Sequence, residues 1–195
     1  MNLPRLLILT DRRQATRPLV DVVRAAVDGG ARAVVLREKD LPRSERAHLA
    51  DQIRPILTEA GALLVVASDA TIPADGVHLA AHDHLPVPWP PLVGRSCHSP
   101  AGLHVAADEG CDWATLSPIF PSPSKPGYGP VLGTAALAGA PLPVYALGGV
   151  DAGRAAACVA AGAAGVAVMG AVMRATDPAA VVANLLRALE GEAGR

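Results

Sequence analysis

Residues 144–170 read VYALGGVDAGRAAACVAAGAAGVAVMG. The short apolar run Val144–Leu147 is followed by two glycines, then by helical periodicity over Gly153–Ala160, and then by a second apolar run, Gly165–Met169. This order predicts a strand, a helix and a second strand that lies parallel to the first.

The same alternation recurs along the whole chain. The expected strands are Arg5–Thr10, Ala33–Arg37, Leu63–Ser68, Gly76–Leu79, Leu92–Ser96, Trp113–Ser117, Val144–Leu147 and Gly165–Met169. The expected helices are Leu19–Asp28, Ser44–Glu59, Pro100–Glu109, Gly153–Ala160 and Pro178–Glu190. The connections after the third, fourth and sixth strands are short or rich in proline, so their helices should be abbreviated.

Eight such units predict an α/β fold, a compact (β/α)₈ TIM barrel that forms one domain over residues 1–195. A TIM barrel typically needs about 200 to 250 residues, which is why some helices must be short. A doubly wound open sheet is the alternative. The first strand–helix turn, Thr10-Asp11-Arg12, lacks the glycine fingerprint of a dinucleotide-binding version of that fold.

Composition narrows the class of protein. The chain is 51% hydrophobic and 18% charged, which suits a buried core and excludes a disordered chain. The net charge is −1 and aromatic residues make up 3%, so a nucleic-acid partner is not expected. The three cysteines form no CxxC pair, which favours free thiols. The apolar stretch in Met1–Thr10 is too short for a signal peptide or a membrane span, so a cytoplasmic protein without a membrane partner is expected.

Charged residues follow the expected strands at their C-terminal ends, where TIM barrels place their functional groups. They are the cations Arg37, Lys39 and Lys125 and the carboxylates Asp69 and Asp83. Together they would suit a Mg²⁺-bound diphosphate, because Mg²⁺ is usually held by one or two carboxylates and by phosphate oxygens. For any single residue, an ordinary ion pair on the barrel rim is the alternative.

Glycines follow the last two strands. Gly148 and Gly149 come after the seventh, and Met169 and Gly170 come after the eighth. Such loops commonly present backbone amides to a phosphate, although a glycine pair can also mark a tight turn. The loop 118–130 contains five prolines and Lys125, and its length and stiffness favour a lid over the site.

At these residues the chain resembles the thiamine phosphate synthase and TenI family of small barrels. The matching stretches are Ile8–Asp11, Gly29–Ala31, Leu36–Asp40, Asp75–Leu79, Gly94–Ser99, Ser117–Lys125, Leu147–Val150 and Ala161–Met169.

The resemblance implies a transferase of thiamine biosynthesis that joins hydroxymethylpyrimidine diphosphate to thiazole phosphate and releases diphosphate. It implies Mg²⁺ as cofactor, held by Asp69 and Asp83. The implied catalytic residues are Arg37, Lys39, Ser96 and Lys125. The implied substrate- and phosphate-binding residues are Ser68, Ser122, Ser124, Gly148, Gly149, Met169 and Gly170. Whether the barrel forms a homodimer stays open.

The chain also departs from the usual synthase pattern. The usual residues are Gln before Arg-Glu-Lys, Asn-Asp-Arg after the third strand, Gly-Gln after His-Leu, Gly before Pro-Ile-Phe and Ser in the last phosphate loop. Their places are taken by Leu36, by Ser68-Asp69-Ala70, by Ala80-Ala81, by Ser117 and by Gly170. We therefore expect several pyrimidine or diphosphate contacts to be lost or replaced.

Two other functions stay open. A TenI-type thiazole tautomerase also has an apolar residue in place of that Gln, but Pro118 stands where its catalytic histidine would lie. A non-catalytic regulatory paralogue could bind thiamine or thiazole phosphate alone. The synthase is favoured because it explains all five charged residues together. His78 is expected to be a semi-buried, hydrogen-bonded structural histidine.

Overall fold

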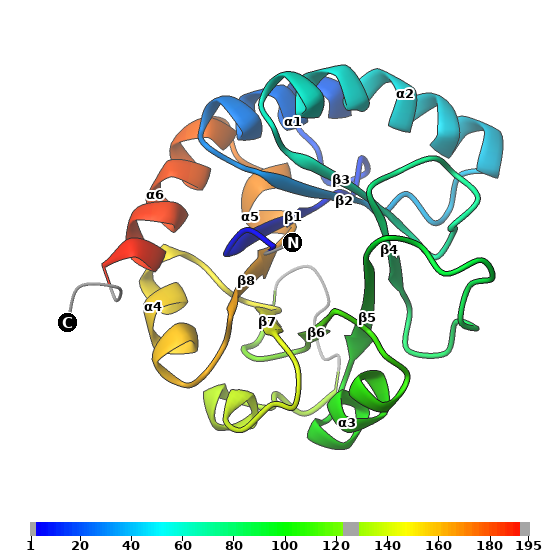
Figure 1. Ribbon diagram of the computed structural model, residues 1–195. Helices are drawn as coiled ribbons and strands as arrows, with labels where there is room; N and C mark the ends of the chain where they lie inside the picture. The colour runs from blue at the N-terminus through cyan, green and yellow to red at the C-terminus, as the bar shows by residue number, and fades with distance from the viewer. Residues whose placement is uncertain (1–2, 123–128, 192–195) are drawn as a thin grey trace.

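Eight parallel strands close into a barrel in chain order in the computed structural model, which describes residues 3–122 and 129–191 (Figure 1). The strands are β1 Leu6–Leu9, β2 Ala33–Leu36, β3 Leu63–Ala67, β4 Gly76–Leu79, β5 Val93–Cys97, β6 Trp113–Leu116, β7 Val144–Leu147 and β8 Gly165–Val168. Each lies within one residue of its predicted bounds. The pairing of β1 with β8 closes the sheet, so the TIM barrel is confirmed and the open sheet is excluded.

The five predicted helices are all present, with bounds that differ by at most one residue. They are α1 Leu19–Asp28, α2 Arg43–Glu59, α3 Pro100–Asp108, α4 Ala152–Ala160 and α6 Pro178–Glu190. Two one-turn elements were not predicted: the 3₁₀ helix η1, Thr134–Leu137, and α5, Gly170–Met173. Four residues are too few to show a helical period. Loops follow β3 and β4, so the abbreviated helices are confirmed there, and η1 is the helix that follows β6.

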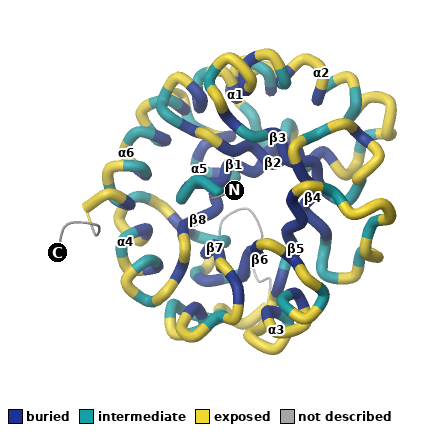
Figure 2. The backbone as a smooth tube through the Cα atoms, viewed as in Figure 1, coloured by how far each residue is buried: buried dark blue, intermediate teal, exposed yellow. Residues whose placement is uncertain are grey.

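Alternate residues of each strand face opposite sides of the sheet, which gives two hydrophobic clusters. The inner cluster fills the barrel with Leu7, Leu9, Ala33, Val35, Val65, Ala67, Trp113, Tyr145 and Ala167. The outer cluster joins the strands to the helices, for example Ile8 to Val22 and Val23 of α1. Figure 2 accordingly shows buried backbone along the strands and exposed backbone on the outer helix faces and loops.

Trp113 is the largest side chain inside the barrel. It is fully buried, stacks on His78 with ring centroids 4.5 Å apart, and meets Tyr145 edge-on at 5.7 Å. A Cβ atom on Gly94, in the neighbouring strand, would lie only 2.6 Å from Cδ2 of Trp113. The glycine therefore makes room for the indole ring.

Acceptor side chains fix the start of three helices. Ser99, Asp151 and Asp177 each accept a hydrogen bond from a backbone amide in the first turn of α3, α4 and α6 respectively. Asp151 lies two residues after the second strand-end glycine, Gly149, so α4 begins at the barrel mouth. Within the described ranges, no helix is both long enough and apolar enough to cross a membrane.

Candidate active site

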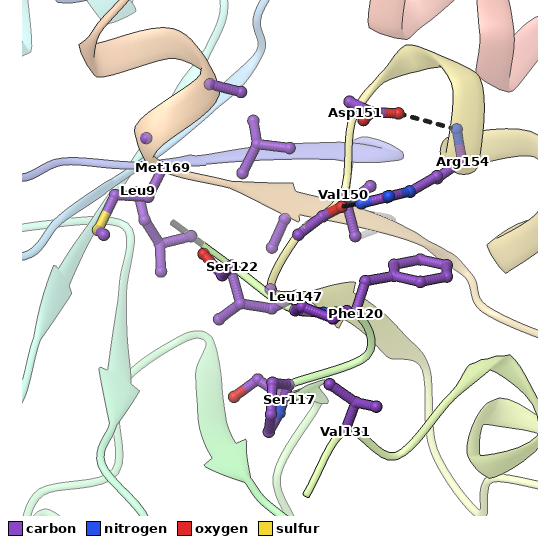
Figure 3. Close-up of a pocket in the computed structure, with 18 of the residues that line it drawn as sticks. Leu9, Ser117, Phe120, Ser122, Val131, Leu147, Val150, Asp151, Arg154 and Met169 are labelled. Carbon is purple, nitrogen blue, oxygen red and sulfur yellow. Dashed lines mark hydrogen bonds between the residues drawn. The ribbon is translucent and has the colours of Figure 1, made fainter. Parts of the chain in front are cut away.

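A cavity of about 780 Å³ opens at the C-terminal ends of β1, β2, β6, β7 and β8 (Figure 3). It borders six of the residues predicted from the sequence: Arg37, Ser122, Gly148, Gly149, Met169 and Gly170. The strand-end rule predicted all of these except Ser122, which came from the family resemblance, although the residues lie up to 133 positions apart along the chain.

The glycine pair after β7 is required by the backbone. Gly148 and Gly149 have φ angles of +95° and +65°, in the left-handed region that favours glycine. A Cβ atom on Gly149 would also lie 2.9 Å from the carbonyl oxygen of Phe120. The tight turn that the sequence left open is therefore present, and it lies on the wall of the cavity.

Cations gather on the β2 side of the mouth. Arg37 is half-buried beside the cavity, and its backbone amide donates to the Thr10 hydroxyl at 2.9 Å. Lys39 is exposed. Burial first, and then the charges of Lys39 and Arg37, lower the pKa of His78 to about 3. Both cations therefore lie close enough to affect the interior of the barrel.

Asp83 lies among these groups. Its carboxylate accepts a hydrogen bond of 2.7 Å from the backbone amide of Ala80. Burial alone would raise its pKa, but the Ser68 hydroxyl, the Ala80 amide and the charges of Lys39 and Arg95 outweigh burial and lower the pKa. Asp83 is thus a stable anion next to two of the predicted site residues.

Arg95, which sequence reasoning did not single out, positions the loop that carries Asp83. It is 4% exposed, and its Nη1 donates to the carbonyl oxygens of Ala80 at 3.0 Å, Ala81 at 3.3 Å and Asp83 at 3.1 Å. Its Nε lies 2.7 Å from Glu109 at the end of α3. Ala81 is bound through its backbone carbonyl oxygen, so this contact does not depend on the side chain at position 81.

Asp69 has other partners. One oxygen lies 2.9 Å from Nη2 of Arg46 on α2, and the other accepts from the amide and hydroxyl of Thr71 at 3.0 and 2.6 Å. Burial opposes ionisation, but Thr71 and Arg46 lower the pKa overall. Asp69 therefore fits the alternative given for single charged residues, an ordinary ion pair on the barrel rim.

The residues present fit Mg²⁺ in number and charge. Two ionised carboxylates follow adjacent strands, and Mg²⁺ needs no more than one or two when phosphate oxygens complete its shell. Among the residues with described positions, no cluster of three or more His, Cys, Asp and Glu side chains could hold a metal. An ion at this site would therefore depend on the substrate for its remaining ligands.

Ser96 meets His78 inside the barrel. The hydroxyl lies 3.0 Å from Nε2 of His78, which is also 3.3 Å from the Thr115 hydroxyl. The prediction of a semi-buried histidine was wrong, because His78 is only 3% exposed. The predicted hydrogen bonding is confirmed at Nε2, whereas the buried Nδ1 has no hydrogen-bond partner among the described residues. The lowered pKa keeps this ring neutral at pH 7.

Leu36, which takes the place of the Gln usual in synthases, does not border the cavity. Leu36 is fully buried in the outer cluster between the strands and the helices, whereas Val35 faces the barrel interior. The expectation that Leu36 removes a substrate contact was wrong, because alternation along β2 turns this side chain away from the mouth. Ala70 is exposed on the loop after β3.

Two arginines on the cavity wall were missed. Arg154 donates to the Gly149 carbonyl at 2.7 Å and lies over the Phe120 ring, 4.9 Å from its centroid; Figure 3 labels both residues. Arg174 also borders the cavity and donates to Oε1 of Gln14. Helical side chains lean toward the helix N-terminus. An arginine about one helical turn after a strand-end glycine is therefore expected to reach back toward the mouth, and this signal in the sequence was not used.

Two predicted residues, Ser124 and Lys125, lie outside the described residues. The lid assigned to the loop 118–130 therefore stays a prediction. Its described N-terminal part contributes Pro118, Phe120 and Ser122 to the cavity wall.

The fold and the mouth together define a (β/α)₈ barrel of the kind that binds a small phosphorylated molecule. The family model described as thiamine monophosphate synthase matches residues 6–172. The chain belongs to the thiamine monophosphate synthase family, whose members are transferases.

Individual relatives agree with this assignment. A thiamine-phosphate synthase of Methanoculleus marisnigri is 44% identical, over 87% of each chain. Another, of Roseiflexus castenholzii, is 36% identical over 91% of this chain and 85% of its own. Among solved structures, thiamine phosphate pyrophosphorylase from Pyrococcus furiosus superposes with a TM-score of 0.86 at 29% identity, over 97% of both chains.

Proposed function

We propose that the chain joins 4-amino-5-hydroxymethyl-2-methylpyrimidine diphosphate to thiazole phosphate, giving thiamine phosphate and diphosphate. The observation that carries this proposal is that ionised Asp83, beside Lys39 and Ser68, and a glycine-lined cavity share one barrel mouth. One region suits a diphosphate and the other suits a phosphate monoester. A volume of about 780 Å³ is within the range of small-molecule sites.

The reaction breaks the bond between the pyrimidine methylene carbon and the diphosphate oxygen and forms a bond from that carbon to the thiazole nitrogen. The departing oxygen gains negative charge as the bond breaks, so cations near it lower the barrier. We assign this role to Arg37, Lys39 and Lys125.

We propose Mg²⁺ as the cofactor, with Asp83 as the first ligand and Asp69 as the second. Bound there, the ion would neutralise charge on the diphosphate. Asp83 is the stronger candidate because its anion is stabilised by groups of the mouth, whereas Asp69 is shared with Arg46.

Ser96 is proposed to contact the pyrimidine. A neutral His78 can either donate to the serine oxygen or accept its proton through Nε2, and the distance of 3.0 Å supports a positioning role for the ring. Ser122, Gly148, Gly149, Met169 and Gly170 are assigned to the phosphate of the thiazole, since they border the cavity together.

We propose small phosphorylated substrates as the only partners, because arginines border the cavity. The near-neutral net charge favours neither a nucleic acid nor a membrane as partner, and we propose a cytoplasmic location. The assigned residues that the structure describes all belong to one barrel, so this part of the site does not require a homodimer.

A turnover assay tests the function. Purified protein with both substrates and Mg²⁺ should yield thiamine phosphate and diphosphate in equal amounts, and omission of either substrate should abolish both products. Binding of thiazole phosphate without any turnover would instead identify a non-catalytic paralogue. A tautomerase would convert the thiazole phosphate tautomer without the pyrimidine substrate, an outcome that Pro118 at the cavity wall does not favour because proline has no side-chain base.

A further inference from the structure

The guanidinium of Arg174 lies over the backbone of Gly170 at the edge of the cavity. Both residues border the cavity. A Cβ atom placed on Gly170 would lie only 2.6 Å from Cζ of Arg174, and its three nearest neighbours all belong to this guanidinium. The absence of a side chain at position 170 therefore makes the space that the guanidinium occupies.

A chain of hydrogen bonds holds this side chain in place. Arg174 donates through Nη1 to Oε1 of Gln14, and Nε2 of Gln14 donates to Oδ2 of Asp11 at 2.7 Å. Asp11 is buried, two residues after the end of β1, and Arg174 directly follows α5, which begins after β8. The guanidinium is thus anchored to the ends of two adjacent strands.

The charge of the cavity wall selects an anion. Among its described lining residues, the charged ones are Arg37, Arg154, Arg174 and Asp151. The Asp151 carboxylate caps α4 by accepting from the Arg154 amide at 3.1 Å. Three guanidinium groups against one carboxylate give the wall a positive balance, so a ligand with negative charge is favoured.

A guanidinium suits a phosphate in particular. It carries five N–H donors in a rigid fork and can bind two oxygens of one phosphate at once. The same geometry lets Arg174 hold Gln14 and a phosphate oxygen together. The Cβ position of Gly170 is covered by the guanidinium, so these donors lie next to the loop assigned to the phosphate.

We propose that Arg174 binds the phosphate group of the thiazole substrate and sets the preference for the phosphorylated acceptor over the corresponding thiazole alcohol. The identity of this acceptor rests on the proposed function. Gly170 is a positioning residue in this arrangement, because any larger side chain would displace the guanidinium.

Calorimetric titration with thiazole phosphate and with thiazole alcohol tests the proposal. Arg174→Gln should weaken binding of the phosphate by about 10- to 100-fold, as expected for a hydrogen-bonded charge, and leave binding of the alcohol unchanged. Arg24→Gln on the outer helix α1 is the matched control and should bind both as the wild type does. Phosphate affinity within twofold of wild type in Arg174→Gln would overturn the proposal.

A second variant tests the same contact if Arg174→Gln fails to fold. Gly170→Ala adds a methyl group whose three nearest neighbours are atoms at the flexible end of Arg174, and it should weaken phosphate binding in the same way. The double variant should lose no more than the stronger single variant, because both changes remove one contact. Fully additive losses would contradict the proposed contact.

The two proposals can fail separately. If the wild type makes no thiamine phosphate but phosphate binding still depends on Arg174, the proposed function is wrong and the Arg174 assignment stands. If turnover is present and Arg174→Gln leaves the KM for thiazole phosphate unchanged, the Arg174 assignment is wrong and the function stands. A wild type that binds neither thiazole phosphate nor inorganic phosphate would overturn both.

Discussion

The two carboxylates assigned to the metal, Asp83 and Asp69, differ in the groups that bind them. Asp83 is held by the Ala80 amide and lies near Lys39, whereas Asp69 is bound to Arg46 and Thr71. Two residues with the same chemistry and similar positions after their strands thus have different partners. Replacement of each carboxylate should therefore have a different effect on metal binding and stability.

The Asp83 carboxylate is expected to matter more for the metal than the Asp69 carboxylate. Asp83→Asn should abolish Mg²⁺-dependent diphosphate binding, because it removes the charge that the ion needs. Asp69→Asn should weaken this binding and also lower stability, since a partly buried Arg46 loses its counter-ion. Titration with diphosphate and Mg²⁺ measures both effects, and Asp21→Asn on α1 is the control. Unchanged affinity in both mouth variants would refute the metal assignment.

His78 should make the fold sensitive to acid. Its pKa of about 3 in the folded protein lies below the ordinary value of 6.5, so the unfolded chain binds more protons between these two pH values. Stability from this group is therefore complete above pH 6.5 and is lost as the pH falls toward 3, by about 1.4 kcal/mol per pH unit.

Urea unfolding at pH 7 and pH 4.5 measures this loss. Between these conditions the wild type should lose about 2 to 3 kcal/mol more than His78→Gln, since roughly two pH units of the window are crossed. Carboxylates such as Asp40 and Asp83, whose lowered pKa values also cost stability in acid, act in both proteins and cancel in the difference. Equal losses in the two proteins would show that His78 is protonated in the fold.

Lys125 is predicted from the sequence to act on the leaving diphosphate. Lys125→Ala should lower kcat by about 10²- to 10³-fold, the usual cost of one contact that stabilises charge in the transition state. The affinity for thiazole phosphate should change little, because that group is assigned to the glycine loops. Steady-state kinetics with both substrates, beside calorimetry with the thiazole alone, separates the two effects. A kcat within a few fold of wild type would remove Lys125 from the site.

At the scale of elements, neighbouring strands fit through small residues at close approaches. Gly94 on β5 lies against the indole of Trp113 on β6, which in turn stacks on His78 of β4. Three consecutive strands are therefore matched through one aromatic ring. A methyl group at position 94 would have to displace the ring or the strand.

Gly94→Ala should destabilise the protein by about 1 to 3 kcal/mol, as overpacking of a core typically does. Gly102→Ala on α3 is the matched control, because its added Cβ would meet nothing closer than 3.5 Å. Alanine favours a helix over glycine, so that variant should be neutral or more stable by up to about 1 kcal/mol. Denaturant unfolding of both variants gives the comparison, and similar destabilisation by the two changes would contradict the packing argument.

The residues assigned to the diphosphate and to the phosphate follow strands of the same closed sheet. A ligand at the mouth should therefore stabilise the entire barrel. Thiazole phosphate at about 100 times its Kd should stabilise the folded state by about 2.7 kcal/mol. For a protein of this size that corresponds to a rise in Tm of about 5 to 10 °C. Thiazole alcohol at the same concentration is the control and should shift the Tm less. No shift with thiazole phosphate or thiamine phosphate at millimolar concentration would argue against the phosphate site.

Much of this architecture can be predicted from local sequence. Parallel strands buried on both faces appear as continuous apolar runs, which is why all eight strands were placed to within one residue. The charged residues and glycines that follow those runs could then be assigned to the mouth, among them Arg37, Asp83 and Gly149. These features depend on residues that are neighbours in the chain.

Other features were decided only by the tertiary structure. Closure depends on the pairing of β1 with β8, and the partner of Asp69 depends on the packing of α2. The bond between Arg174 and Gln14 joins residues 160 positions apart. Local propensity and periodicity carry no information about such contacts, because their energy arises only when distant segments are brought together by the closed barrel.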